Sequence, residues 1–313
     1  MKGLYTYFIE NISADIRGSL LSGQSFRWNY YQDSEQKYFG VIGDDLFILE
    51  NNEDDWYTVT TTKKFSCDEE FHEFIGFYFS LDINPDDLFP AGFSEQYPGI
   101  WRLIKPYLGI KVLRQNAFET LVTFMCAQGL GMNIIRRQIS YLTREYGKEH
   151  TVDIAGKPFT YNSFPSPETL AGIAPDSLQL CTNNNCIRAT NIIKAAYSVA
   201  TGQLDLEDLQ DPDMPLETSR ERLSAHSGIG NKIADCVLLF GLHRFSAFPI
   251  DTHVRQYLAT WFSIDKALQS LTQKNYLFLQ EEVSRILNPE FAGFAGHILF
   301  HCWRKEVKHL TSF

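Results

Sequence analysis

The chain is poor in cysteine, and its cysteines are scattered. The 313 residues contain six thiols: Cys67, Cys126, Cys181, Cys186, Cys236 and Cys302. Small secreted domains carry a denser disulfide framework, and zinc sites use close pairs of ligands, so the spacing favours neither class. We therefore expect a reducing setting inside the cell and no required metal or other cofactor.

A long hydrophobic run is also absent. The longest uncharged stretch, residues 120–135, contains Gln128 and Asn133 and is shorter than the roughly 18 apolar residues that cross a bilayer. Glu10 interrupts the apolar N-terminal stretch too early for a signal peptide. The sequence thus predicts neither a membrane span nor a targeting segment.

The sequence also lacks an overall excess of positive charge. Such an excess would favour a nucleic-acid partner. The formal net charge is −10 at pH 7. The first 100 residues hold 18 acidic and 6 basic side chains, whereas the remaining residues hold 20 and 22. Phosphate binding needs a local basic or amide-rich surface and not a basic whole. The net charge therefore excludes no nucleic-acid partner.

Two parts of the sequence follow different patterns. In residues 38–62, the β-forming runs YFGVIG, LFILE and WYTVTTT alternate with turn residues, as in antiparallel hairpins. Beyond residue 112 the apolar spacing becomes helical, as at Ile135, Ile139 and Leu142. An apolar content of 44% with 21% charged residues is typical of a globular protein. We therefore expect an α+β protein.

The change of pattern predicts a domain boundary near residues 111–114. This gives a β-rich domain over residues 1–112 and a helical domain over residues 113–313. Within the helical part, further helices are expected over residues 187–200, 252–261 and 280–287 and on both sides of a turn within 220–242.

The most informative segment is ERLSAHSGIGNKIADCVLLFGLHRFSAFPIDTH, residues 221–253. It predicts a helix, a Gly-Ile-Gly turn and a second helix. Gly228 and Gly230 have no side chains, so a phosphate can approach the backbone amides where the second helix begins. A Gly-X-Gly connection between helices is common, and the turn alone is not decisive.

Lys232 follows this turn, and Cys236 lies four residues further on the same helix face, with Asp235 between them. Asp251 comes 19 residues after Lys232, where an apolar stretch ends and a helix opens. Each residue has an ordinary interpretation, Lys232 as a solvated helix lysine and Asp251 as a helix N-cap. Their combination with the glycine turn is hard to obtain by accident.

GIGNKIADC followed by PIDTH resembles the active-site segment of bifunctional helix-hairpin-helix DNA glycosylases, and of the 8-oxoguanine DNA glycosylase family in particular. SGQSFRW (22–28), YFSLDINPDDL (78–88) and VLRQNAFETL (112–121) resemble other segments of that family. The resemblance implies an N-terminal antiparallel β domain, like TATA-binding protein, followed by an all-α helix-hairpin-helix glycosylase domain with the active site in the cleft.

The family's reaction cuts the bond between a damaged base and its sugar. By resemblance, Lys232 would attack the sugar C1′ as a neutral amine, and the Schiff base would then cleave the strand by β-elimination. Asp251 would stabilise the positive charge that develops on the sugar while it caps its helix. The base must first be flipped out of the double-stranded DNA.

Three further residues match the family's base pocket. The backbone carbonyl of Gly23 would accept the N7 proton of 8-oxoguanine, while Cys236 and Phe300 would sandwich the flipped base. The ordinary alternatives are a turn glycine, an inert buried thiol and core packing.

Four residues match DNA-contacting positions. Gly228, Gly230 and His253 would meet phosphates, and Arg188 would read the cytosine left opposite the lesion. A histidine beside a helix cap is often merely structural. The expected partner is damaged double-stranded DNA, and the protein is expected to bind it as a monomer. The expected location is inside the cell, in the cytoplasm or at the nucleoid if the source is prokaryotic.

The chain also departs from the family pattern around the base-reading positions. Gly296 stands where the family usually has a glutamine that reads the base edge, and Gly129 and Ile134 stand where it has polar groups that hold the cytosine. Ile187 replaces a tyrosine wedge, and Ser227 replaces a proline before the glycine turn. Gln128 or Asn133, one register away, could restore contacts to the cytosine.

Two rival functions stay open at this point. Gly296 favours a glycosylase for a different lesion, such as another oxidised purine or an alkylated base. A DNA-binding scaffold without catalysis is the other, although retention of both Lys232 and Asp251 argues against it. An iron–sulfur cluster, present in some relatives, is not expected, because Cys302 stands alone near the C-terminal end.

Overall fold

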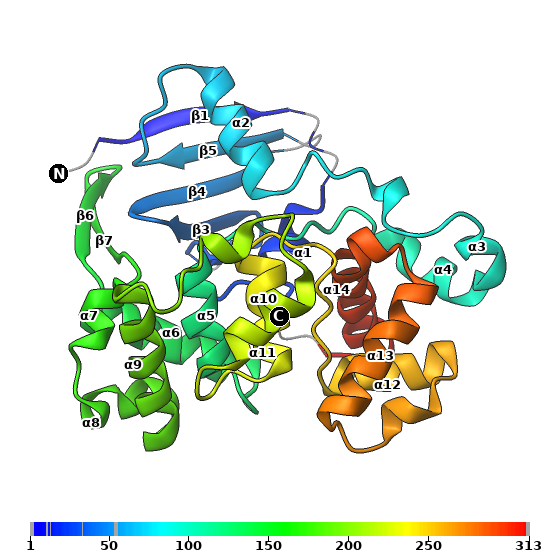
Figure 1. Cartoon of the computed structure of the whole chain (residues 1–313). Coiled ribbons are helices and arrows are strands. Elements are labelled where there is room, and N and C mark those ends of the chain that lie inside the picture. The colour runs from blue at the N-terminus through cyan, green and yellow to red at the C-terminus, as the bar shows by residue number, and fades with distance from the viewer. Residues whose placement is uncertain (1–2, 11, 13, 33, 53–55, 311–313) are drawn as a thin grey trace.

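The computed structural model describes residues 3–10, 12, 14–32, 34–52 and 56–310. An antiparallel sheet lies on one side of the molecule and most helices lie on the other (Figure 1). The sheet has the order β1-β5-β4-β3-β2, and a second sheet pairs β6 with β7. The strands are β1 (Tyr5–Ile9), β2 (Asn29–Tyr30), β3 (Lys37–Ile42), β4 (Asp45–Asn52), β5 (Trp56–Thr61), β6 (Glu149–Ile154) and β7 (Lys157–Asn162).

All the α-helices except α1 follow the large sheet in the sequence. The first four are α1 (Ile16–Leu21), α2 (Asp68–Tyr78), α3 (Phe93–Gln96) and α4 (Pro98–Ile104). The next five are α5 (Ala117–Cys126), α6 (Met132–Tyr146), α7 (Pro167–Ala171), α8 (Pro175–Leu178) and α9 (Cys186–Ala200). The last five are α10 (Leu216–Ser224), α11 (Asn231–Cys236), α12 (Thr252–Phe262), α13 (Gln273–Ile286) and α14 (Ala292–Cys302). The helix expected over 280–287 thus begins earlier, at the Thr272 cap.

Strand β4 shows why both faces of the large sheet are covered. Successive side chains of a strand point to opposite faces. Phe47 and Leu49 belong to a core cluster with Phe71 of α2, which crosses that face in Figure 1. Leu46 and Ile48 belong to another cluster, which the β6–β7 hairpin completes from the other face. The expected hairpins of the N-terminal part are confirmed by this register.

The predicted α+β class is confirmed, with one correction to the all-α description of the second part. The β6–β7 hairpin lies beyond residue 112 and turns at Ala155 and Gly156, which have φ angles of 53° and 79°. Such a two-residue turn with positive φ angles matches the twist of a hairpin. The second part is mostly helical, and its hairpin forms a separate two-stranded sheet that packs against the large sheet.

The helical core draws on residues from both parts of the sequence. Its central cluster includes Phe93 of α3 and Ile104 of α4 together with residues of α5 through α14. Helices α3 and α4 precede residue 112, so the core of the helical part begins before the expected boundary. The division at residue 112 stays a prediction.

Gln24 joins the two parts at one buried point. Its side-chain amide donates to the carbonyls of Ser19 and Lys111, at 2.8 Å each, and its side-chain oxygen accepts the Leu113 amide at 2.8 Å. The Gln24 carbonyl accepts from the Gln115 side chain at 2.9 Å. Two of the segments that carry the family resemblance are thus held together by hydrogen bonds away from solvent.

In the described parts of the chain, no helix is both long enough and apolar enough to cross a membrane.

Gln24→Met should destabilise the protein by roughly 2–4 kcal/mol, because it removes the hydrogen bonds that Gln24 makes with the buried Leu113 amide and with the Ser19 and Lys111 carbonyls. The free energy of unfolding in urea measures the effect. Gln36→Met, at an exposed position, is the matched control and should change it by less than about 0.5 kcal/mol. Equal stability of the two variants would contradict the role given to Gln24.

Candidate active site

The expected helix-hairpin-helix is present and places Lys232 at the start of a buried helix. Helix α10 ends at Ser224, the turn holds Gly228 at a φ of +86°, and α11 begins after Gly230 as N-cap. A Cβ at Gly228 would lie 2.8 Å from Asn191, so the conformation and the space both require glycine. An added Cβ at Gly230 would meet no described atom within 4 Å, so its backbone stays approachable.

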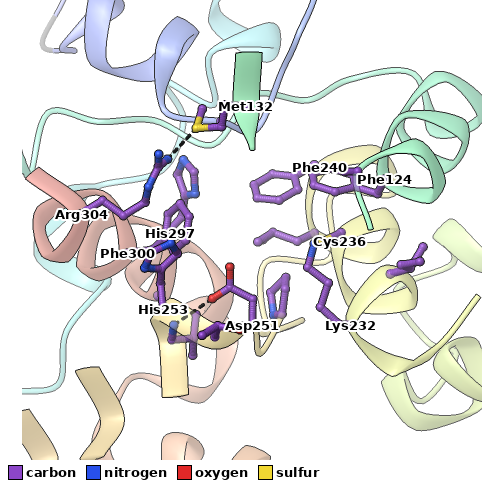
Figure 2. A pocket seen from close by; sticks show the side chains of 18 of the residues that line it. Phe124, Met132, Lys232, Cys236, Phe240, Asp251, His253, His297, Phe300 and Arg304 are labelled. Carbon is purple, nitrogen blue, oxygen red and sulfur yellow. Dashed lines mark hydrogen bonds between the residues drawn. The ribbon is translucent and has the colours of Figure 1, made fainter. Parts of the chain in front are cut away.

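A pocket of about 650 Å³ opens where α11, α12 and α14 meet the segment around Gly23 (Figure 2). Six of the predicted site residues line it: Gly23, Lys232, Cys236, Asp251, His253 and Phe300. Lys232 and Asp251 come from separate elements, and both side chains face the pocket in Figure 2. The structure therefore brings together the two residues that the sequence analysis placed at the centre.

Asp251 caps α12, as its ordinary interpretation requires. Its Oδ1 accepts the backbone N–H of Val254 at 2.8 Å. One oxygen thus holds the carboxylate in place, and the carboxylate still lines the pocket. The structural interpretation and the functional one are compatible at this residue.

The surroundings of Lys232 are apolar. Its Nζ lies 4.9 Å from the centre of the Phe124 ring. Cys236, one turn further, is 2% exposed, and burial raises the pKa of its thiol to about 11, against an opposing effect of Lys232. Cys236 is therefore a neutral thiol near pH 7 and serves as a wall of the pocket.

A buried carboxylate connects the helix of Lys232 to the segment that ends in Asp251. Asp235 is fully buried, and it accepts from Arg220 Nε at 2.8 Å, from Gln280 Nε2 at 3.0 Å and from the hydroxyl of Tyr276. Burial raises the pKa of Asp235 to about 6, while Arg220 and the hydrogen bonds oppose this shift. This network was not predicted from the sequence.

The same network reaches the strand-like segment before Asp251. Gln280 Nε2 donates to the Phe248 carbonyl at 2.6 Å, and the Ile250 amide donates to the Tyr276 hydroxyl at 3.3 Å. Asp235 follows Lys232 by three residues, and Ile250 directly precedes Asp251. The network therefore fixes the two candidate catalytic residues relative to each other.

The other predicted pocket residues, His253, Phe300 and Gly23, lie on the wall of the pocket across from Lys232. The His253 ring lies edge-on to Phe300, with centroids 5.9 Å apart. Burial lowers the pKa of His253, and Asp251 opposes this shift. Gly23 has a φ of +88°, so its backbone conformation favours glycine, and a Cβ there would lie 2.7 Å from Cε at the end of the Met132 side chain.

Arg188, Gly228 and Gly230 do not line this pocket. Arg188 donates to the carbonyls of Cys126 and Gln128, at 3.3 and 2.6 Å, and so holds the loop before α6. The side chain of Gln128 donates to the Gly228 carbonyl at 2.8 Å. The DNA-contacting roles of these residues stay predictions.

Sequence reasoning missed several residues of the pocket wall, among them Met132, Phe248, His297 and Arg304. His297 is buried beside Phe300, its Nε2 lies 2.8 Å from the Ser22 hydroxyl, and burial lowers its pKa to about 3. The sequence offered one signal for Arg304 as a pocket residue. Arg304 lies four residues after Phe300, in the helical turn that continues α14.

Among the residues that the structure describes, no group of three or more His, Cys, Asp or Glu side chains is arranged to hold a metal ion.

The family comparison matches the 8-oxoguanine DNA glycosylase N-terminal domain over residues 7–121. The N-glycosylase/DNA lyase of Saccharomyces cerevisiae is 28% identical over 254 residues, which are 75% of this chain and 65% of the yeast protein. The chain thus spans just under two thirds of that relative's length. The N-glycosylase/DNA lyase OGG1 of Arabidopsis thaliana is 27% identical over 284 residues, 89% of this chain and 74% of the plant protein.

The fold also matches a solved structure along nearly its whole length. The structure of MBOgg1 in complex with a low affinity DNA ligand has a TM-score of 0.77 and 26% sequence identity, and the match covers 98% of this chain and 97% of that one. The overall arrangement of the sheet and the helices is therefore shared with that protein.

Tyr276→Phe removes the hydroxyl that bonds both Asp235 and the Ile250 amide, and it should lower the free energy of unfolding by about 1–3 kcal/mol. Chemical denaturation measures this loss. Tyr197→Phe, on a tyrosine that is 52% exposed, is the matched control and should be neutral within about 0.5 kcal/mol. If both variants behave alike, the network does not hold the site together.

Proposed function

Because the chain belongs to the 8-oxoguanine DNA glycosylase family of the helix-hairpin-helix superfamily, we propose that it is a base-excision repair glycosylase and lyase. It removes an oxidised purine from double-stranded DNA, and 8-oxoguanine is the proposed main substrate. The observation that carries the proposal is the convergence of Lys232 and Asp251 on one pocket large enough for a flipped base. The relatives named above are N-glycosylase/DNA lyases, which supports the same reaction.

In the proposed mechanism, Lys232 Nζ attacks the sugar C1′ of the flipped nucleotide, and the bond from C1′ to the base breaks with its electron pair leaving on the base. Phe124 lies beside Nζ, with its ring centre 4.9 Å away, and forms part of the wall of the pocket that Lys232 faces. Nζ then loses a proton and the C1′–O4′ bond breaks, with O4′ taking a proton, so that the sugar ring opens and an iminium joins C1′ to Nζ. Loss of a proton from C2′ then allows β-elimination of the 3′ phosphate.

Asp251 supports this step electrostatically. A carboxylate beside C1′ stabilises the positive charge that develops on the sugar as the base leaves. Its hydrogen bond with the Val254 amide keeps it oriented without using both oxygens. Cys236 and Phe300 are proposed to enclose the base, and the Gly23 carbonyl to meet its edge.

The helix-hairpin-helix supplies the proposed contact with the DNA backbone. The amides after Gly228 and at Gly230 lie at the start of α11, where a phosphate is favoured, and His253 is proposed to meet a second phosphate. A DNA substrate places the activity inside the cell, and we propose that the protein acts as a monomer.

Lys232→Gln should abolish borohydride trapping on duplex DNA that contains 8-oxoguanine, together with strand cleavage, because an amide forms no Schiff base. Trapping is read as a covalent adduct on a denaturing gel. Lys194→Gln, on a lysine of α9 outside the pocket, is the control and should trap as the wild type does. Undiminished trapping by Lys232→Gln would refute the assignment. A wild-type protein that binds the duplex but never traps would favour the non-catalytic scaffold.

Excision should depend only weakly on the base opposite the lesion. Gly129 and Ile134 offer no side-chain hydrogen bond to an orphaned cytosine, and Gln128 donates to Gly228 instead. Each missing base-edge contact removes about 1–3 kcal/mol of discrimination. Excision rates of 8-oxoguanine opposite cytosine and opposite adenine should therefore agree within about tenfold. A preference for cytosine of about a hundredfold would mean that Arg188 or Asn133 supplies the lost contacts.

A further inference from the structure

Helix α14 and the turn after it present Gly296, Phe300 and Arg304 at intervals of four residues. This spacing places them along one helix face. A π-helical turn, Trp303–Val307, continues α14 and carries Arg304 near its start. All three residues line the pocket, so its wall runs from a glycine through an aromatic ring to a guanidinium.

No side chain at position 296 can read a bound base in this pocket. A Cβ on Gly296 would lie 2.2 Å from Cε2 of Phe248 and 2.7 Å from its Cδ2. The Phe248 ring is 1% exposed and is packed in the helical core, so it cannot give way cheaply. A hydrogen-bonding group on this face must therefore come from another position.

Arg304 is placed to supply it. Its guanidinium carbon lies 5.4 Å from the Phe300 ring centre, and its Nη1 would be 3.7 Å from a Cβ on Gly23. Figure 2 shows Arg304 with Met132 on one side of the pocket and Lys232 with Phe124 on the other. A nucleotide whose sugar meets Lys232 would therefore direct its base towards Arg304.

Three other polar side chains of the pocket hold protein groups, and Arg304 also has a protein partner. His297 bonds the Ser22 hydroxyl, Gln128 bonds the Gly228 carbonyl, and Arg255 donates to the Ala267 carbonyl at 2.8 Å. Arg304 Nη1 donates at 2.7 Å to the thioether sulfur of Met132. A thioether is a weak acceptor, and a carbonyl oxygen of a bound base is a stronger acceptor for the same N–H group.

We propose that Arg304 determines which base is excised, by donating a hydrogen bond to a carbonyl oxygen on the base edge, an inference that rests on the proposed glycosylase function. A guanidinium has N–H donors and no acceptor. It can therefore donate to the C6 carbonyl of a guanine-derived base, whereas the C6 amino group of an adenine-derived base is itself a donor and is disfavoured there. The preferred substrate class is an oxidised guanine, and 8-oxoadenine is rejected.

The test measures single-turnover cleavage of duplexes that carry 8-oxoguanine, 8-oxoadenine or an abasic site. Each base-excision rate is divided by the same enzyme's rate on the abasic duplex, which needs Lys232 but offers no base to read. The wild type should excise 8-oxoguanine faster than 8-oxoadenine by about 10–100-fold. Arg304→Met should lose about 10–100-fold of its normalised rate on 8-oxoguanine.

Arg304→Gln separates base reading from a general defect. The amide offers both a donor and an acceptor, so it can also pair with an amino group. Its preference for 8-oxoguanine over 8-oxoadenine should fall by about tenfold or more, through a higher normalised rate on 8-oxoadenine. Lys305→Met, which removes the neighbouring exposed cation, is the control and should keep the wild-type preference.

The outcomes are distinguishable. If Arg304→Met and Arg304→Gln keep the wild-type preference and normalised rates, Arg304 does not read the base, although the glycosylase function stands. A wild type that excises both lesions equally also overturns the inference alone. If the wild type cleaves neither lesion nor the abasic duplex, the proposed function fails and the inference fails with it.

Discussion

The geometry of the site depends on the buried carboxylate of Asp235. It receives hydrogen bonds from α10 and α13, and through Tyr276 and Gln280 it reaches the backbone just before Asp251. A charge buried to this degree costs several kcal/mol unless it is fully paired, so each donor around it is held in one place. Lys232, three residues earlier on α11, takes its position from the same constraint. The spacing of the proposed nucleophile and its partner is thus set by buried hydrogen bonds behind the pocket wall.

The fold class and the centre of the site could be predicted because their signals are local. The hairpins around β4, the glycine turn at Gly228 and the lysine and aspartate near it are read from neighbouring residues. The β6–β7 hairpin was missed although Ala155 and Gly156 form a two-residue turn, because the segment lies inside a long helical stretch. Arg304 and the Asp235 network could not be found, since their partners are distant in sequence: Met132 lies 172 residues from Arg304, and Gln280 lies 45 from Asp235.

The structure also gives physical reasons for the departures from the family pattern. Gly296 is tolerated because the Phe248 ring occupies the space that a side chain would take. Gly129 lies in a loop that Arg188 fixes through two carbonyls, so the loop keeps its shape without polar side chains of its own. The pocket wall and the loop before α6 thus depart from the expected family pattern, while Lys232 and Asp251 match it. A change in which base pair is recognised is compatible with the same chemistry.

The central claim is that Lys232 forms the covalent bond with the sugar, and its most direct test is to map the trapped adduct. Borohydride reduction on a lesion-bearing duplex, nuclease digestion and peptide mass spectrometry would locate the modified residue. The account predicts the sugar remnant on Lys232, in the peptide that contains GIGNKIADC. A remnant on another lysine or on the N-terminal amine, or full cleavage activity without any trapped adduct, would contradict it.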